Sequence, residues 1–149
     1  MNPVLLHDIA RDAAEAAHEG QVDALSRDYF EGHVRQVVYR LRGYGAVSLA
    51  TAWLHDVVED TPTTLDDLRD EGLPDEVVEA VDAITRRAGE QYPAYIERVR
   101  LNPIALHVKL ADNAQNLADN DALALVDPTK AASLKRRYLA ARERLEAAP

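Results

Sequence analysis

The hydrophobic pattern along the 149-residue chain is helical almost throughout. Apolar residues recur three or four positions apart, which places them on one face of an α-helix, and no segment alternates as a β-strand would. The pattern predicts helices that end at glycine, proline or polar capping residues. They are expected over residues 4–17, 29–41, 46–58, 64–70, 74–84, 92–99, 104–118 and 129–147. We therefore predict an all-α globule of seven or eight helices.

Two of these helices stand out because ionisable residues interrupt a nearly continuous apolar run. Residues 46–54 are almost all apolar, and the chain then continues with His55, Asp56, Glu59 and Asp60. Helical spacing would place His55 over Glu59 and Asp56 over Asp60. Burying an imidazole and three carboxylates is costly unless a cation balances them, and a divalent metal would do so. Alternatively, His55 caps the end of the helix, and Glu59 and Asp60 belong to a solvent-exposed segment in which the chain leaves it.

The second helix carries a carboxylate inside another apolar run. Asp112 follows Leu110 and Ala111, with Lys109 one turn before it and Asn116 one turn after it. An ion pair between Lys109 and Asp112 would explain this carboxylate structurally. A role as metal ligand is the alternative, because carboxylate oxygens bind divalent cations.

A third segment completes a candidate ligand set. His33 lies in the first turns of the helix predicted over residues 29–41, beside its apolar stripe. Four side chains from three helices could then share one metal: His33, His55, Asp56 and Asp112. Two imidazoles and two carboxylates suit manganese, iron, zinc or magnesium and leave room for water and substrate oxygens. The metal would lower the pKa of a water molecule, and Glu59 or Asp60 could accept its proton.

Composition narrows the function further. The length suits one domain spanning residues 1–149, and the apolar fraction of 47% is typical of a globular protein. The absence of cysteine excludes thiolate ligands, and the net charge of −9 argues against nucleic-acid binding. No signal segment or membrane-length apolar run is visible, so we expect a cytoplasmic protein without a membrane partner. Residues 129–149 are the exception in charge, with six Lys or Arg and two Glu.

The four candidate ligands resemble the H…HD…D metal signature of the HD phosphohydrolase superfamily. Residues 54–61, LHDVVEDT, resemble the HDxxEDT motif of the RelA/SpoT-type alarmone hydrolase domains. The segment from Lys109 to Asn116 resembles their KLADxxxN motif. Residues 17–21, AHEGQ, resemble the AHxGQ string before their first metal histidine, and residues 83–86 resemble their V/L-T-K/R turn. The resemblance covers approximately residues 9–120.

The resemblance implies a small-molecule nucleotide substrate, because those domains remove the 3′-pyrophosphate from guanosine tetra- and pentaphosphate. It implies one metal, usually manganese, held by the four candidate ligands. Glu59 and Asp60 match the pair that positions or deprotonates the attacking water, and Asn116 matches a residue near the nucleoside. The candidate substrate-binding cations are Lys109, Arg86 and Arg27.

Other readings stay open. The family usually has a basic loop that contacts guanine, whereas Arg27 is the only cation in residues 22–28. This difference favours another HD-type activity, such as a 5′-nucleotidase or a pyrophosphatase, although Glu59, Asp60 and Thr61 favour the alarmone hydrolases. A non-catalytic metal- and nucleotide-binding sensor, docking a partner through its basic last helix, is a third hypothesis. Assembly into a homo-oligomer also stays open.

Overall fold

The structure, a computed structural model, describes residues 1–148, and its regular elements are helices. Within these residues the only β-type pairing is an isolated bridge between Val22 and Asp28. Eight α-helices have six residues or more, which confirms the prediction of an all-α fold with seven or eight helices. They are α1 (Pro3–Ala17), α2 (Arg35–Arg40), α3 (Ala46–Leu54), α5 (Leu65–Asp70), α6 (Asp75–Ile84), α7 (Tyr92–Arg100), α8 (Pro103–Ala124) and α9 (Pro128–Glu146).

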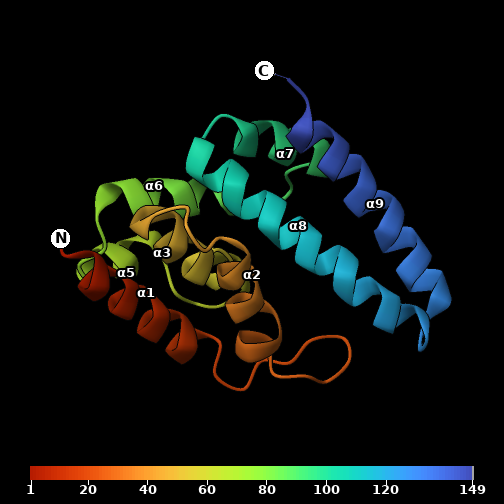
Figure 1. Ribbon diagram of the computed structural model, residues 1–149, viewed down its shortest axis with the longest axis horizontal. Helices are drawn as coiled ribbons and strands as arrows, with labels where there is room; N and C mark the ends of the chain where they lie inside the picture. Colours follow the sequence, from red (N-terminus) through yellow and green to blue (C-terminus); the bar gives the residue numbers. More distant parts are fainter. Residues whose placement is uncertain (149) are drawn as a thin grey trace.

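Helices α8 and α9 form a long antiparallel pair along one side of the molecule (Figure 1). Helices α1, α3, α5 and α6 lie on the other side of α8, and α7 lies at one end of the pair. None of the described helices combines the length and the apolarity that a membrane crossing requires.

Helix α3 is the centre of the hydrophobic core. It packs against α1, α2, α6 and α8, and six of its nine residues are buried. Small side chains such as Ala50 and Ala52, both fully buried, let the neighbouring helices approach closely. The buried hydroxyl of Thr51 donates a hydrogen bond to the carbonyl of Val47 at 2.8 Å, so it is satisfied inside the helix.

The helix predicted over residues 46–58 is interrupted where its ionisable residues begin. Helix α3 ends at Leu54, and a one-turn helix, α4 (Val57–Asp60), follows. Between them the backbone of Asp56 has φ −109° and ψ −1°, close to the bridge region in which many active-site residues lie. The sequence prediction of one continuous helix was therefore wrong. The break changes the direction of the chain next to two candidate ligands.

The helix predicted over residues 29–41 begins with a widened π-helical turn, η1 (Phe30–Val34), which continues into α2. The Arg35 N–H donates to the carbonyl of Phe30, five residues earlier, as a π-helical turn requires. His33 lies in this turn and is buried. Such turns occur mainly as single insertions in α-helices, frequently at functional sites.

Helix α8 continues to Ala124, beyond the end predicted at residue 118. The polar residues Asp119 and Asn120, which follow the predicted end, take part in side-chain contacts instead. Asn120 donates from Nδ2 to the carbonyl of Ala131 at 2.8 Å, and Gln115 donates to Asp119 at 3.3 Å. Helix packing therefore outweighed the local turn preference of these residues.

Candidate metal centre and adjoining clefts

Four side chains from separate parts of the chain converge at the end of α3. His33 comes from η1, His55 and Asp56 come from the turn after α3, and Asp112 comes from α8. One potential ligand atom from each residue lies within 4.8 Å of those of the other three. The structure thus brings together all four residues that the sequence singled out as metal ligands.

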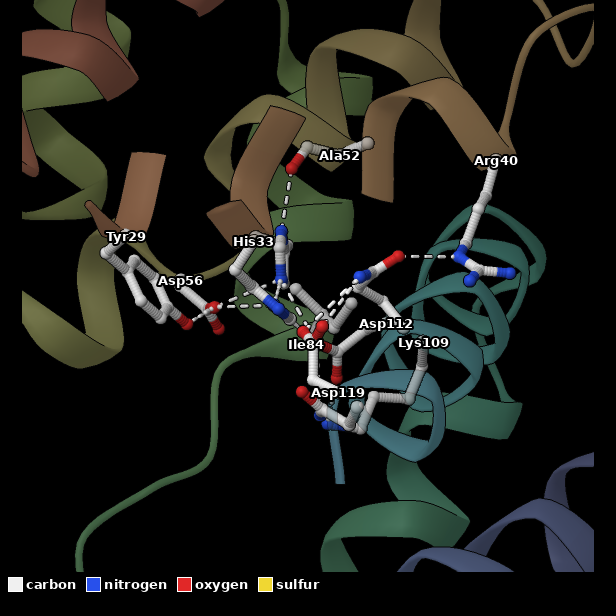
Figure 2. Close-up of polar contacts among 12 residues, drawn as sticks. Tyr29, His33, Arg40, Ala52, Asp56, Ile84, Lys109, Asp112 and Asp119 are labelled. Carbon is white, nitrogen blue, oxygen red and sulfur yellow. Dashed lines mark hydrogen bonds and ion pairs between the residues drawn. The ribbon is translucent and has the colours of Figure 1, made fainter. Parts of the chain in front are cut away.

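The closest contacts among the four residues join each histidine to one aspartate (Figure 2). His33 Nε2 lies 2.9 Å from Asp112 Oδ1, and His55 Nε2 lies 3.0 Å from Asp56 Oδ2. The Nε2 atoms of the two histidines are 3.3 Å apart. Two nitrogens and two oxygens therefore face one small volume, which is a donor set suited to a divalent first-row metal or magnesium.

A backbone contact fixes the orientation of the His55 ring. Its Nδ1 lies 2.7 Å from the carbonyl oxygen of Ala52, which can only accept a hydrogen bond. Nδ1 therefore carries a proton, and in the neutral ring Nε2 presents its lone pair to the cluster. Metal-ligating histidines typically donate the N–H of their other ring nitrogen to such a carbonyl or to a carboxylate, which orients the ring.

Asp112 divides its two carboxylate oxygens between two roles. Oδ2 accepts a hydrogen bond from Lys109 Nζ at 2.9 Å, while Oδ1 faces His33 and His55. Asn116 also approaches Oδ1, at 3.4 Å. The ion pair and the ligand role, which the sequence offered as alternatives, are thus compatible.

Tyr29 holds the other aspartate, and the sequence reasoning did not single it out. Its hydroxyl donates a hydrogen bond to Asp56 Oδ2, and its ring stacks on His33 with centroids 5.1 Å apart (Figure 2). The only sequence signal was an aromatic residue one turn before His33, which is equally compatible with a core position.

The imidazoles and carboxylates of the cluster shift one another's pKa values. Burial alone would lower the pKa of His55, but the carboxylates of Asp56 and Asp112 raise it well above the ordinary value of 6.5. Burial would likewise raise the pKa of Asp56, yet the imidazoles of His55 and His33 hold it well below 3.8. A divalent cation would satisfy the same carboxylates.

Glu59 and Asp60, on α4, line the cleft beside this cluster. Glu59 Oε1 accepts a hydrogen bond from the backbone N–H of Arg86 at 2.8 Å, and Asp60 Oδ2 accepts one from Gln21 at 3.3 Å. Partial burial, together with the negative charge of Asp56, raises the pKa of both carboxyl groups. A raised pKa lies closer to neutral pH, and it makes the carboxylate a better proton acceptor.

The cleft has a volume of about 280 Å³ and joins the ligand cluster to helices α7 and α9. Three of the predicted substrate contacts line it, namely Arg86, Lys109 and Asn116. The sequence did not place residues of α7 and α9 in this cleft. Those residues are Tyr92, Tyr95, Leu134, Arg137 and Tyr138.

Arg27, the fourth predicted substrate contact, lies in a second cavity of about 200 Å³. Tyr29, His33 and Asn116 line both cavities, so the two adjoin. The Arg27 guanidinium is engaged on two sides: Nε lies 2.8 Å from Asp23 Oδ2, and Nη2 lies 3.6 Å from Asp119 Oδ1.

No protein-family model matches the sequence. Among solved structures, the chain is similar to a metazoan ortholog of SpoT that hydrolyzes ppGpp and plays a role in starvation responses. The two share 26% sequence identity and superpose with a TM-score of 0.69, over 82% of this chain and 74% of that one. This similarity and the buried His/Asp cluster show that the chain has an HD-domain fold of the ppGpp-hydrolase type.

Proposed function

We propose that the protein is a metal-dependent nucleotide phosphohydrolase, and specifically a guanosine 3′,5′-bis(diphosphate) 3′-pyrophosphohydrolase. The observation that carries the proposal is the convergence of His33, His55, Asp56 and Asp112 within 4.8 Å beside a cleft. The similarity to a protein that hydrolyzes ppGpp supports the choice of substrate.

In this proposal the four clustered residues hold one divalent metal, which we propose is manganese. When bound, the metal supplies a Lewis acid that polarises a phosphoryl oxygen and lowers the pKa of water. The buried position of the ligands and the contacts that Ala52, Tyr29 and Lys109 make with them would fix their geometry before substrate binds.

The side chains of α4 perform the proton transfer. Glu59 or Asp60 takes a proton from the attacking water as its oxygen bonds to phosphorus. The bond between that phosphorus and the 3′-oxygen breaks, pyrophosphate leaves, and the 3′-oxygen gains a proton. Lys109 and Arg86 offset phosphate charge, and Asn116 contacts the nucleoside at the junction of the two cavities.

Arg27 would contact the base side of the substrate in the second cavity. One observation favours a different nucleotide: this guanidinium is already engaged by Asp23 and Asp119. A second candidate function is therefore another HD-type nucleotide phosphohydrolase, a 5′-nucleotidase or a pyrophosphatase, with the same metal centre.

The test is hydrolysis by purified, manganese-loaded protein across a nucleotide panel. We expect guanosine tetraphosphate to yield pyrophosphate and guanosine 5′-diphosphate, and His55→Ala or Asp56→Ala to abolish the reaction. His107→Ala and Asp121→Ala are matched controls, because both residues are exposed and lie outside the cleft. Faster turnover of nucleoside monophosphates would favour the second candidate, and inactivity across the panel would contradict both.

A further inference from the structure

Two guanidinium groups lie against one tyrosine ring in the wall of the metal cleft. The Cζ atom of Arg137, on α9, is 3.9 Å from the centroid of the Tyr92 ring, and that of Arg86 is 5.4 Å from it. All three residues line the cleft that contains the metal cluster. Stacking on an aromatic face holds a guanidinium in place while leaving its N–H groups free.

The two arginines differ in what already binds them. Arg86 donates from Nε and Nη2 to the carbonyl of Glu90, at 3.0 and 2.9 Å, so its position is fixed. Arg137 makes no hydrogen bond or ion pair with any residue in the part of the chain that the structure describes. It thus presents planar, unengaged donors, which match the oxygens of a phosphate group.

The charges that line the cleft indicate why a second phosphate group of the substrate would need the Arg137 guanidinium. Asp56, Glu59, Asp60 and Asp112 make the metal end acidic, and Lys109 is already paired with Asp112 at 2.9 Å. In the proposed reaction a metal held at that end would meet the phosphate group that reacts. Any further phosphate group of the substrate would face acidic surroundings in a protein of net charge −9, unless local cations receive it.

We infer that Arg137, held by Tyr92 and supported by Arg86, forms a second anion subsite for the phosphate group that is not hydrolysed. The inference rests on the proposed function and adds to it a preference for nucleotides with two separate phosphate groups. In guanosine tetraphosphate the group bound there is the 5′-diphosphate.

Binding of guanosine 5′-diphosphate tests the subsite without requiring turnover. Arg137→Met keeps an aliphatic stem but removes the donors, and calorimetry should show affinity reduced about tenfold. Arg136→Met is the matched control, because it removes the same charge from the adjacent exposed position but lines neither cavity. It should change the affinity less than about twofold, as expected for a surface substitution.

Steady-state kinetics give a second readout. Arg137→Met should raise KM for guanosine tetraphosphate about tenfold, but should not raise it for guanosine 3′-diphosphate, which lacks the 5′ phosphates. Equal losses in Arg136→Met and Arg137→Met, or no binding of guanosine 5′-diphosphate by the unaltered protein, would overturn the inference. If the manganese-loaded protein hydrolyses nothing while the binding difference persists, the proposed function fails and the subsite stands.

Discussion

Lys109 Nζ lies 2.9 Å from Asp112 Oδ2, which leaves the other oxygen of this aspartate to face both histidines. Both side chains are largely buried, and removing one partner of a buried ion pair costs about 3–5 kcal/mol. We expect Lys109→Met to lower the free energy of unfolding of the metal-free protein by about 3 kcal/mol. Manganese should recover much of this loss, because it offers the carboxylate another cation. Urea unfolding with and without manganese measures both effects, and Lys135→Met, on the exposed face of α9, is the control.

Manganese should stabilise the unaltered protein because the metal binds the native cluster and not the unfolded chain. At a hundredfold excess over Kd the gain is about 2.7 kcal/mol, or roughly 5–10 °C in Tm for a domain of this size. A chelator should reverse the shift. His55→Ala should weaken manganese binding more than about a hundredfold, since loss of even an outer partner costs roughly 10- to 100-fold. A full shift in this variant would argue against the cluster as the metal site.

Tyr29→Phe tests the contact between the tyrosine hydroxyl and Asp56. The ring would remain stacked on His33, but the carboxylate would lose the donor that orients it. We expect manganese affinity to fall roughly 10- to 100-fold while the fold is kept. Tyr39→Phe removes a hydroxyl from an exposed ring on α2 and should leave the affinity unchanged. Calorimetric titration of both variants makes the comparison.

Glu59→Gln and Asp60→Asn should separate catalysis from metal binding. Loss of a proton acceptor typically costs about 10²–10⁴ in rate. The manganese-dependent rise in Tm should persist, because neither residue belongs to the four-ligand cluster. Asp70→Asn, on the exposed surface of α5, should retain full activity. If neither cleft variant slows hydrolysis, the proton acceptor lies elsewhere.

Glu90 should make stability depend on pH. Its carboxylate accepts hydrogen bonds from Arg98 at 3.0 and 2.9 Å, and these hold its pKa at about 2, below the ordinary value of 4.5. A lowered pKa stabilises the fold above pH 4.5, and the stabilisation is lost as the pH falls toward 2. Glu90→Gln should therefore destabilise the protein at pH 7, with a difference from the unaltered protein that shrinks below pH 4.5. Urea midpoints across this range test it, and Glu79→Gln, an exposed acid of α6, should show no such trend.

The sequence predicted features that depend on local pattern. An apolar stretch as dense as Ala46–Leu54 has few alternatives to a buried helix, and the structure confirms its burial. The break that follows was not predictable, because His55 and Asp56 have no strong preference against continuing a helix. At the break His55 and Asp56 contact Asp112 and Tyr29, and these contacts exist only after distant segments have packed.

The cleft residues of α9 illustrate a second limit. Six cations follow residue 129, and their charge alone does not say which of them faces inward. The spacing of the cations relative to the apolar residues carried the signal. Ala131, Ala141 and Leu145 form the buried stripe of α9, and Arg137 lies one helical turn before Ala141, at the edge of that stripe. Even so, only the packing of α9 against α7 and α8 brings Arg137 onto Tyr92.

The π-helical turn at Phe30–Val34 contains one residue more than an α-helical turn would. Deleting a residue there would restore ordinary α-helical pairing, but it would remove the wide turn that carries His33 and so displace this side chain relative to α2. Substitutions in this segment leave the residue count and the wide turn unchanged, whereas a deletion removes the turn. Grafts and shuffled loops between related proteins will succeed only when their junctions preserve the residue count from Tyr29 to α2.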